Sequence, residues 1–165
     1  RNIKQIARSC SLDISETSRI KDMLGLLSLY FDKPLILINS HLDKQTKQMV
    51  CGYALGHYLE HQLLMDLHTL NKFLTIKDKH ILLYEHNAFT SHLMLESDEV
   101  YQMTKRGLDA AQISAAKRIH LNLVLVKLLE LHHLGYDLRH YHAQHHAFIK
   151  QFNLPAHFQF DVAAG

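Results

Sequence analysis

The apolar segment Asn122–Leu134 places the strongest constraint on the fold. Leucine and valine fill most of its positions, and Gly135, a residue type favoured just after a helix end, follows it. A helix this apolar must bury most of its surface, so the segment predicts a core helix. The longest apolar run, Leu121–Leu131, is interrupted and too short to span a bilayer.

Other segments predict further helices around a small sheet. The apolar runs Leu26–Phe31 and Leu35–Ile38 are separated by Asp32-Lys33-Pro34, a sequence that favours a turn, and they predict an antiparallel hairpin. Helices are expected at Ser18–Leu24, Lys44–Leu67, Lys77–Leu95, Asp109–Lys117 and His140–Phe152. The pattern therefore predicts an α+β chain that is rich in helix and has a small antiparallel sheet.

Composition and charge narrow the possible functions. The 165 residues are 47% hydrophobic and 21% charged, as in globular proteins, which excludes wholesale disorder. A net charge of +2 is too small for direct binding to nucleic-acid phosphate. Cys10 and Cys51 form no recognisable disulfide framework, and neither a signal peptide nor a membrane span is visible. We therefore expect a cytoplasmic protein with no membrane partner.

The chain contains 15 histidines, some with spacings that suit a metal ion. His57 and His61 are four residues apart on one expected helix, with Glu60 between them, so both imidazoles can reach one zinc ion. The alternative for these residues is an ordinary exposed helix face. A second group, near the C-terminus, comprises His132, His133, His140, His142, His145 and His146. No acidic or cysteine partner has matching spacing there, so a solvated helix face is expected.

Three stretches carry the most specific pattern in the chain. Residues 36–42 read I-L-I-N-S-H-L, residues 48–61 read Q-M-V-C-G-Y-A-L-G-H-Y-L-E-H, and residues 85–96 read E-H-N-A-F-T-S-H-L-M-L-E. In this order they resemble the I-x-I-N-x-x-L, A-H-E-L-G-H-x-L-x-H and E-A-N-x-F-A-x-x-L-L-M-P blocks of the ImmA/IrrE family of metallopeptidases. With a similar helical tail, the resemblance covers roughly residues 20–138.

The resemblance implies a fold, a cofactor and a partner. A zinc-metallopeptidase-like helical core with the small sheet is expected over residues 1–98, and a C-terminal helical subdomain over residues 99–165. Zinc is the family cofactor, with His57 as a retained ligand and Glu85 as the acidic ligand. Family members act in bacterial mobile genetic elements and stress responses, where they cleave or inactivate helix-turn-helix repressors. The implied partner is such a repressor or another regulatory protein.

The chain departs from the family pattern at two positions needed for hydrolysis. The first zinc histidine of the family falls on Tyr53, and its general base, a glutamate, falls on Ala54. A phenol with an ordinary pKa near ~10 is a poor zinc ligand at neutral pH. Ala54 cannot accept a proton, and loss of a general base typically costs ~10²–10⁴ in rate. Weak or absent zinc binding and weak or absent peptidase activity are therefore expected.

Three explanations of this departure remain open. The chain is a natural pseudo-peptidase that keeps the fold for binding, or the Glu→Ala change is an engineered inactivation, or the metal site has shifted by one turn. A shifted site would use His57 and His61 as ligands and Glu60 as base, and would make the chain an active zinc peptidase. A non-catalytic regulator that binds proteins through the same groove is the alternative from a different class of function.

Overall fold

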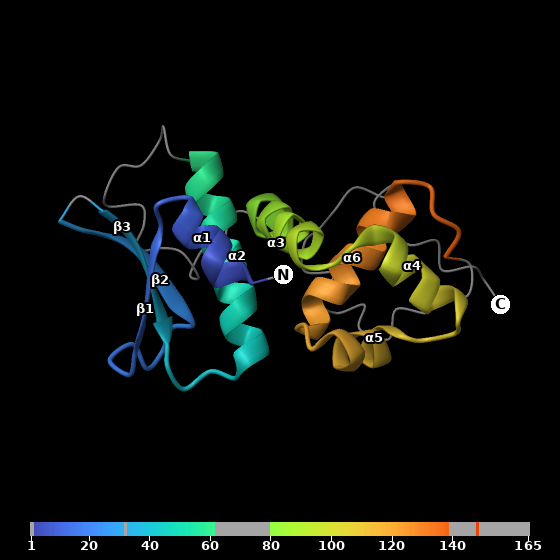
Figure 1. Ribbon diagram of the computed structural model, residues 1–165, viewed down its shortest axis with the longest axis horizontal. Helices are drawn as coiled ribbons and strands as arrows, with labels where there is room; N and C mark the ends of the chain where they lie inside the picture. Colours follow the sequence, from blue (N-terminus) through green and yellow to red (C-terminus); the bar gives the residue numbers. More distant parts are fainter. Residues whose placement is uncertain (1, 32, 62–79, 139–147, 149–165) are drawn as a thin grey trace. The chain divides into compact units, whose positions relative to one another are not determined.

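The computed structural model describes residues 2–31, 33–61, 80–138 and 148, with side chains described throughout except at His61, His80, Ile81 and Leu82. The elements in chain order are α1 (Ile3–Ser9), β1 (Asp13–Thr17), β2 (Gly25–Tyr30), β3 (Lys33–Asn39), α2 (Lys44–His61), α3 (His80–Met94), α4 (Ser97–Lys105), α5 (Ala110–Lys117) and α6 (Leu121–His133) (Figure 1). The chain forms two compact units, residues 1–79 and 80–165. The division at residue 98 expected above, between a metallopeptidase-like domain and a C-terminal helical subdomain, stays a prediction.

The first unit is a three-stranded mixed sheet with helices on one face. Central β3 runs antiparallel to β2, with Leu37 opposite Leu26, and parallel to β1, with Ile36 opposite Ile14. Figure 1 shows α1 and α2 on the same side of the sheet. The predicted hairpin is confirmed. Strand β1 was not expected, and it makes the sheet mixed rather than purely antiparallel.

Alternating burial along β3 places the core of the first unit between the sheet and the helices. Ile36 and Ile38 are fully buried, as is Leu27 on β2, whereas Leu35 and Leu37 on the other face are only half-buried. Successive strand residues point to opposite faces, so this pattern sets the register of the sheet against the helices.

Gly25 allows α2 to approach the sheet closely. A Cβ atom at this position would lie 2.6 Å from Cγ1 of Val50 on α2 and 2.9 Å from the carbonyl oxygen of Leu37. Both distances are shorter than van der Waals contact, so the hydrogen of glycine is the side chain that fits here.

The prediction of a helix at Ser18–Leu24 is wrong, because these residues form bends between β1 and β2. The Thr17 hydroxyl accepts a hydrogen bond from the Arg19 N–H at 3.2 Å, and the Asn39 amide donates to the Met23 carbonyl at 3.1 Å. Hydrogen bonds from side chains to the backbone compete with helix formation in this way.

Helix α6 is the centre of the second unit, where it packs against α3, α4 and α5. All residues of Leu123–Leu129 are buried, which confirms the predicted core helix. The helix ends before Gly135, whose φ of +86° lies in the left-handed region. The N–H groups of Gly135 and Tyr136 donate to carbonyls of the last turn at 3.0 Å each, as in a glycine-terminated helix.

The helices expected at Lys44–Leu67, Lys77–Leu95 and Asp109–Lys117 correspond to α2, α3 and α5 within the described residues, while α1 and α4 were not expected. The helix expected at His140–Phe152 lies outside the described residues, apart from helical Phe148. Within the described ranges, no helix has both the length and the apolar character needed to cross a membrane.

Gly25→Ala should lower the free energy of unfolding by about 1–3 kcal/mol, because the added methyl group overpacks the contact between β2 and α2. Urea unfolding measures this loss. Ser15→Ala, at an exposed position of β1, is the control and should change stability by no more than about 0.5 kcal/mol. Equal stabilities of the two variants would contradict the close approach of α2 to the sheet.

Candidate functional site

Helix α2 carries most of the candidate residues, and local hydrogen bonds fix where it begins. The Asp43 carboxylate accepts hydrogen bonds from two backbone N–H groups of the first turn, at 2.8 and 3.0 Å, as an N-cap does. Asn39, at the end of β3, is 6% exposed, and its side chain bonds the Met23 carbonyl and the His41 N–H. These contacts connect the end of β3 to the loop before β2 and to the approach to α2.

Tyr53 occupies the position of the first zinc histidine in the resembled motif, and its phenol suits a metal poorly. The side chain is 7% exposed. Burial raises the pKa of Tyr53 to about 12, and the negative charge of Glu60 acts in the same direction. With this pKa, Tyr53 stays a neutral phenol at physiological pH. Because a metal ligand must be deprotonated, the neutral phenol is a poor ligand for zinc.

Ala54 occupies the position of the general base and is completely buried. It follows Val50 by one helical turn, and residues four apart on a helix share a face. Val50 lies against Gly25 of the sheet. Position 54 therefore shares the face of α2 on which Val50 packs against the sheet, and its alanine side chain carries no proton acceptor.

The residues of the shifted site begin one turn later on α2. His57 is half-buried and Glu60 is exposed. His57 follows Tyr53 by four residues and shares its face of the helix. The side chain of His61 lies outside the described part of the structure, so a site built from His57, Glu60 and His61 stays a prediction.

The expected acidic ligand, Glu85, lies on α3 in the second unit. It is exposed, whereas its neighbours Tyr84 and His86 are 6% and 0% exposed. Because α2 and α3 belong to different units, the pairing of Glu85 with His57 stays a prediction. Among the side chains that the structure describes, no three of His, Cys, Asp or Glu form a group that could hold a metal ion.

At positions 53 and 54 of α2, the residues present do not fit the catalytic zinc site of the resembled motif. Such an ion takes three protein ligands, here two imidazoles and a carboxylate, and a separate base accepts a proton from its bound water. Tyr53 contributes a buried neutral phenol, and Ala54 contributes no acceptor. In the register of the resembled motif, Tyr53 and Ala54 therefore supply neither the first ligand nor the base, and no hydrolytic step follows from these two residues.

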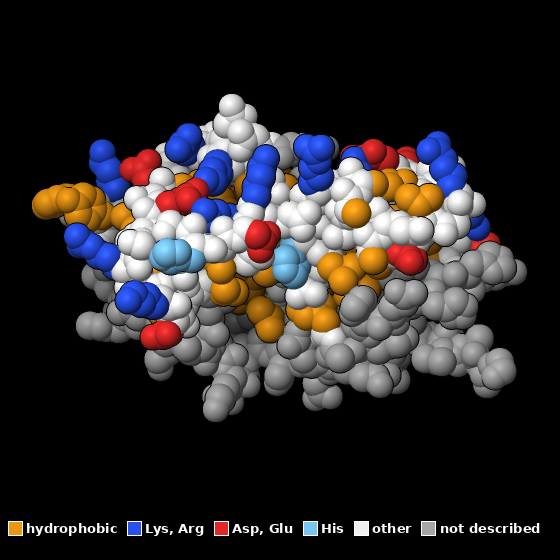
Figure 2. Space-filling model, turned by 90° about the horizontal axis from the view of Figure 1, so that it is seen from below, with side chains coloured by type: hydrophobic (Ala, Val, Ile, Leu, Met, Phe, Trp, Pro, Cys, Tyr) orange, Lys and Arg blue, Asp and Glu red, His pale blue; other side chains and the backbone are white. Residues whose placement is uncertain are grey.

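The tip of the β2–β3 hairpin presents an aromatic pair to solvent. Tyr30 and Phe31 are 64% and 83% exposed, and their ring centroids lie 4.6 Å apart in an edge-to-face arrangement. Figure 2 shows hydrophobic side chains projecting at its left end, where Figure 1 places this hairpin. Exposed aromatic side chains are enriched in protein interfaces, so the tip is a candidate contact surface.

Sequence reasoning missed a polar network in the second unit. Lys127 lies on the apolar helix α6 and is 1% exposed, with partners on α3 and α4. The sequence signal for this network is a charged residue within an apolar segment that must be buried.

Of the C-terminal histidines, His132 and His133 are half-buried on α6. The other four lie outside the described residues.

Comparison with known families identifies one domain. The profile of the IrrE N-terminal-like domain matches residues 15–129, a span that begins in β1 and ends in α6. The chain has no significant match among the curated proteins or the solved structures.

Ala54→Glu should destabilise the chain by at least about 1–3 kcal/mol, because it buries a charge in the contact between α2 and the sheet. Unfolding at neutral pH measures the loss. Ala54→Gln is a matched variant of similar volume without the charge and should be less destabilising. A fully stable Ala54→Glu variant would show that position 54 does not face the sheet.

Proposed function

Because the chain belongs to the ImmA/IrrE family of metallopeptidases, we propose that it is a degenerate member that acts on a helix-turn-helix repressor by binding it rather than by hydrolysis. Its proposed setting is a bacterial mobile genetic element, in the cytoplasm. In this proposal zinc binding is weak or absent, and the chain contacts neither nucleic acid nor membrane directly.

The state of positions 53 and 54 is the observation that carries the proposal. Tyr53 and Ala54 are both buried within α2. The phenol of Tyr53 has a pKa raised to about 12. Ala54 lies one turn after Val50, on the face of α2 that packs on the sheet. At these two positions a peptidase needs a metal ligand and a general base, whereas the buried side chains here contribute packing. A substitution at one of the two positions would restore only one of these groups.

The exposed hairpin tip supports a binding role. Tyr30 and Phe31 offer rigid aromatic area at little cost in conformational entropy, which favours their use as anchors in a partner's pocket. The strands behind them are paired along their length, from Gly25 opposite Ile38 to Tyr30 opposite Lys33. A paired hairpin holds the aromatic side chains in a defined place.

Tyr53→His tests whether the family metal site can be restored. The new imidazole and that of His57 would lie one turn apart, and with Glu85 they would complete three ligands. We expect about one zinc per chain by elemental analysis, without a gain in activity because Ala54 remains. Tyr53→Phe is the control and should match the unchanged chain. A folded Tyr53→His variant that binds no zinc at micromolar concentration would show that Glu85 is not the third ligand.

Binding and cleavage can be separated with purified helix-turn-helix repressors from the source genome. We expect the chain to bind one of them and leave it intact, with no effect of a chelator. Replacing both Tyr30 and Phe31 by serine should weaken binding by about tenfold or more, because aromatic anchors are worth at least ~1–2 kcal/mol each. Chelator-sensitive cleavage by the unchanged chain would contradict the proposal and favour the site of His57, Glu60 and His61.

A further inference from the structure

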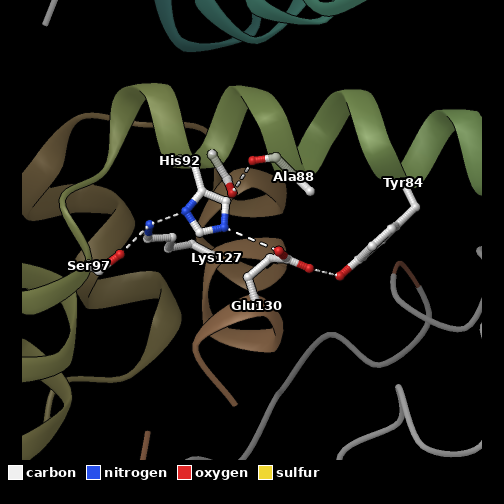
Figure 3. A network of polar contacts seen from close by, with 7 residues as sticks. Tyr84, Ala88, His92, Ser97, Lys127 and Glu130 are labelled. Atoms are coloured by element: carbon white, nitrogen blue, oxygen red, sulfur yellow. Dashed lines mark hydrogen bonds and ion pairs between the residues drawn. The ribbon is translucent and has the colours of Figure 1, made fainter. Parts of the chain in front are cut away.

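Lys127 is a charged residue in the core of the second unit. It is 1% exposed, and its neighbours on α6, Val126 and Leu128, are fully buried. The ammonium group donates to Nδ1 of His92 on α3 at 2.8 Å and to the hydroxyl of Ser97, the first residue of α4, at 2.9 Å (Figure 3). One buried side chain therefore ties three helices together.

The other side of the His92 ring contacts a carboxylate on α6. Nε2 of His92 lies 3.2 Å from Oε2 of Glu130, and the Tyr84 hydroxyl donates to the other carboxylate oxygen. The hydrogen bond from His92, and then that from Tyr84, hold the pKa of Glu130 below its usual range. Glu130 is thus an ionised acceptor at neutral pH.

The chemistry of the partners determines which nitrogen of His92 carries the proton. A lysine ammonium has donors only, so Nδ1 must offer a lone pair to Lys127. Nε2 then carries the hydrogen and donates to Glu130. Only the neutral imidazole in this tautomer makes both bonds, with a positive charge on one side and a negative charge on the other.

We propose that His92 is a proton-controlled latch, whose neutral imidazole holds α3 to α4 and α6 through Lys127 and whose protonation releases Lys127. A protonated ring has no lone pair for the ammonium, and its Nδ1–H would face Lys127 across 2.8 Å. Histidine is the side chain whose ordinary titration lies between about pH 5 and 8, so mild acidification is the trigger.

The contact between protonated His92 and Glu130 opposes this release, and the difference in burial decides the balance. The side chains of His92 and Glu130 are 36% and 22% exposed, so water screens their attraction. Lys127 is 1% exposed, so water screens its repulsion from a second positive charge much less. Water therefore screens the repulsion on the buried side less than the attraction on the exposed side.

Other polar and charged groups surround the latch. From α6, Lys127 and Glu130 contact the ring, and the positive charge of His133 also acts on Glu130. From α3, Tyr84 donates to Glu130 and is neutral, because burial raises its pKa further above neutrality. From α4, Ser97 carries no charge. Protonation of His92 thus places a second positive charge next to Lys127.

Hydrogen exchange of the peptides that cover α3 and α6 tests the latch in the full chain. Rates are corrected for intrinsic exchange at about pH 7.5 and about pH 5.5. Acidification should increase local opening about tenfold in the unchanged chain, because the hydrogen bond from Lys127 to His92 is lost. In His92→Asn the amide oxygen can replace Nδ1 as acceptor without titrating, so opening should change less than about twofold.

Two further variants separate the latch from general acid sensitivity. Lys127→Met keeps an unbranched apolar side chain in the core and removes the ammonium, so it should also lose the response to pH. His133→Gln removes the neighbouring histidine and should retain most of the response. The proposal is overturned if Lys127→Met or His92→Asn responds to acid like the unchanged chain, or if His133→Gln alone abolishes the response.

Discussion

Close packing of α2 on the sheet is the constraint on which the candidate site depends. Gly25 removes the side chain that would collide with Val50, and the helix approaches the strands there. The same helical face carries Ala54 one turn later, so the sheet determines what size and charge position 54 accepts. A carboxylate at position 54, which would act as the base in a peptidase, would here disturb the packing of the first unit.

The second unit depends in the same way on one helix, α6, but the core around this helix contains a charged side chain, that of Lys127. A buried ammonium is strongly unfavourable unless its donors are satisfied. Lys127 meets this condition through His92 and Ser97, and Glu130 completes the network through the other side of the ring. Apolar packing brings α3 and α6 together, and the network requires particular residues to face each other along that contact.

The packing of α2 on the sheet and the network around Lys127 both belong to the scaffold of this member of the ImmA/IrrE family. The chemistry of the site depends on different residues. The family profile spans the sheet, α2 and the helices up to α6. Within that scaffold, Tyr53 and Ala54 provide a buried phenol and a methyl group in place of an imidazole and a carboxylate. Our binding proposal requires that the scaffold persists without hydrolytic groups, and the exposed rings of Tyr30 and Phe31 offer a surface for such binding.

The sequence by itself determined the features that depend on local pattern: the β2–β3 hairpin, the core helix α6 and the departure at positions 53 and 54. Periodicity and turn residues act over a few neighbours, so they can be read from the chain. Only the tertiary structure decided the rest. Strand β1 is a polar segment that becomes a strand by pairing with β3, and residues 18–24 bend because Asn39, far along the chain, holds Met23. The partners of Lys127 lie 30 and 35 residues away, and contacts between distant residues leave no periodic trace in the sequence.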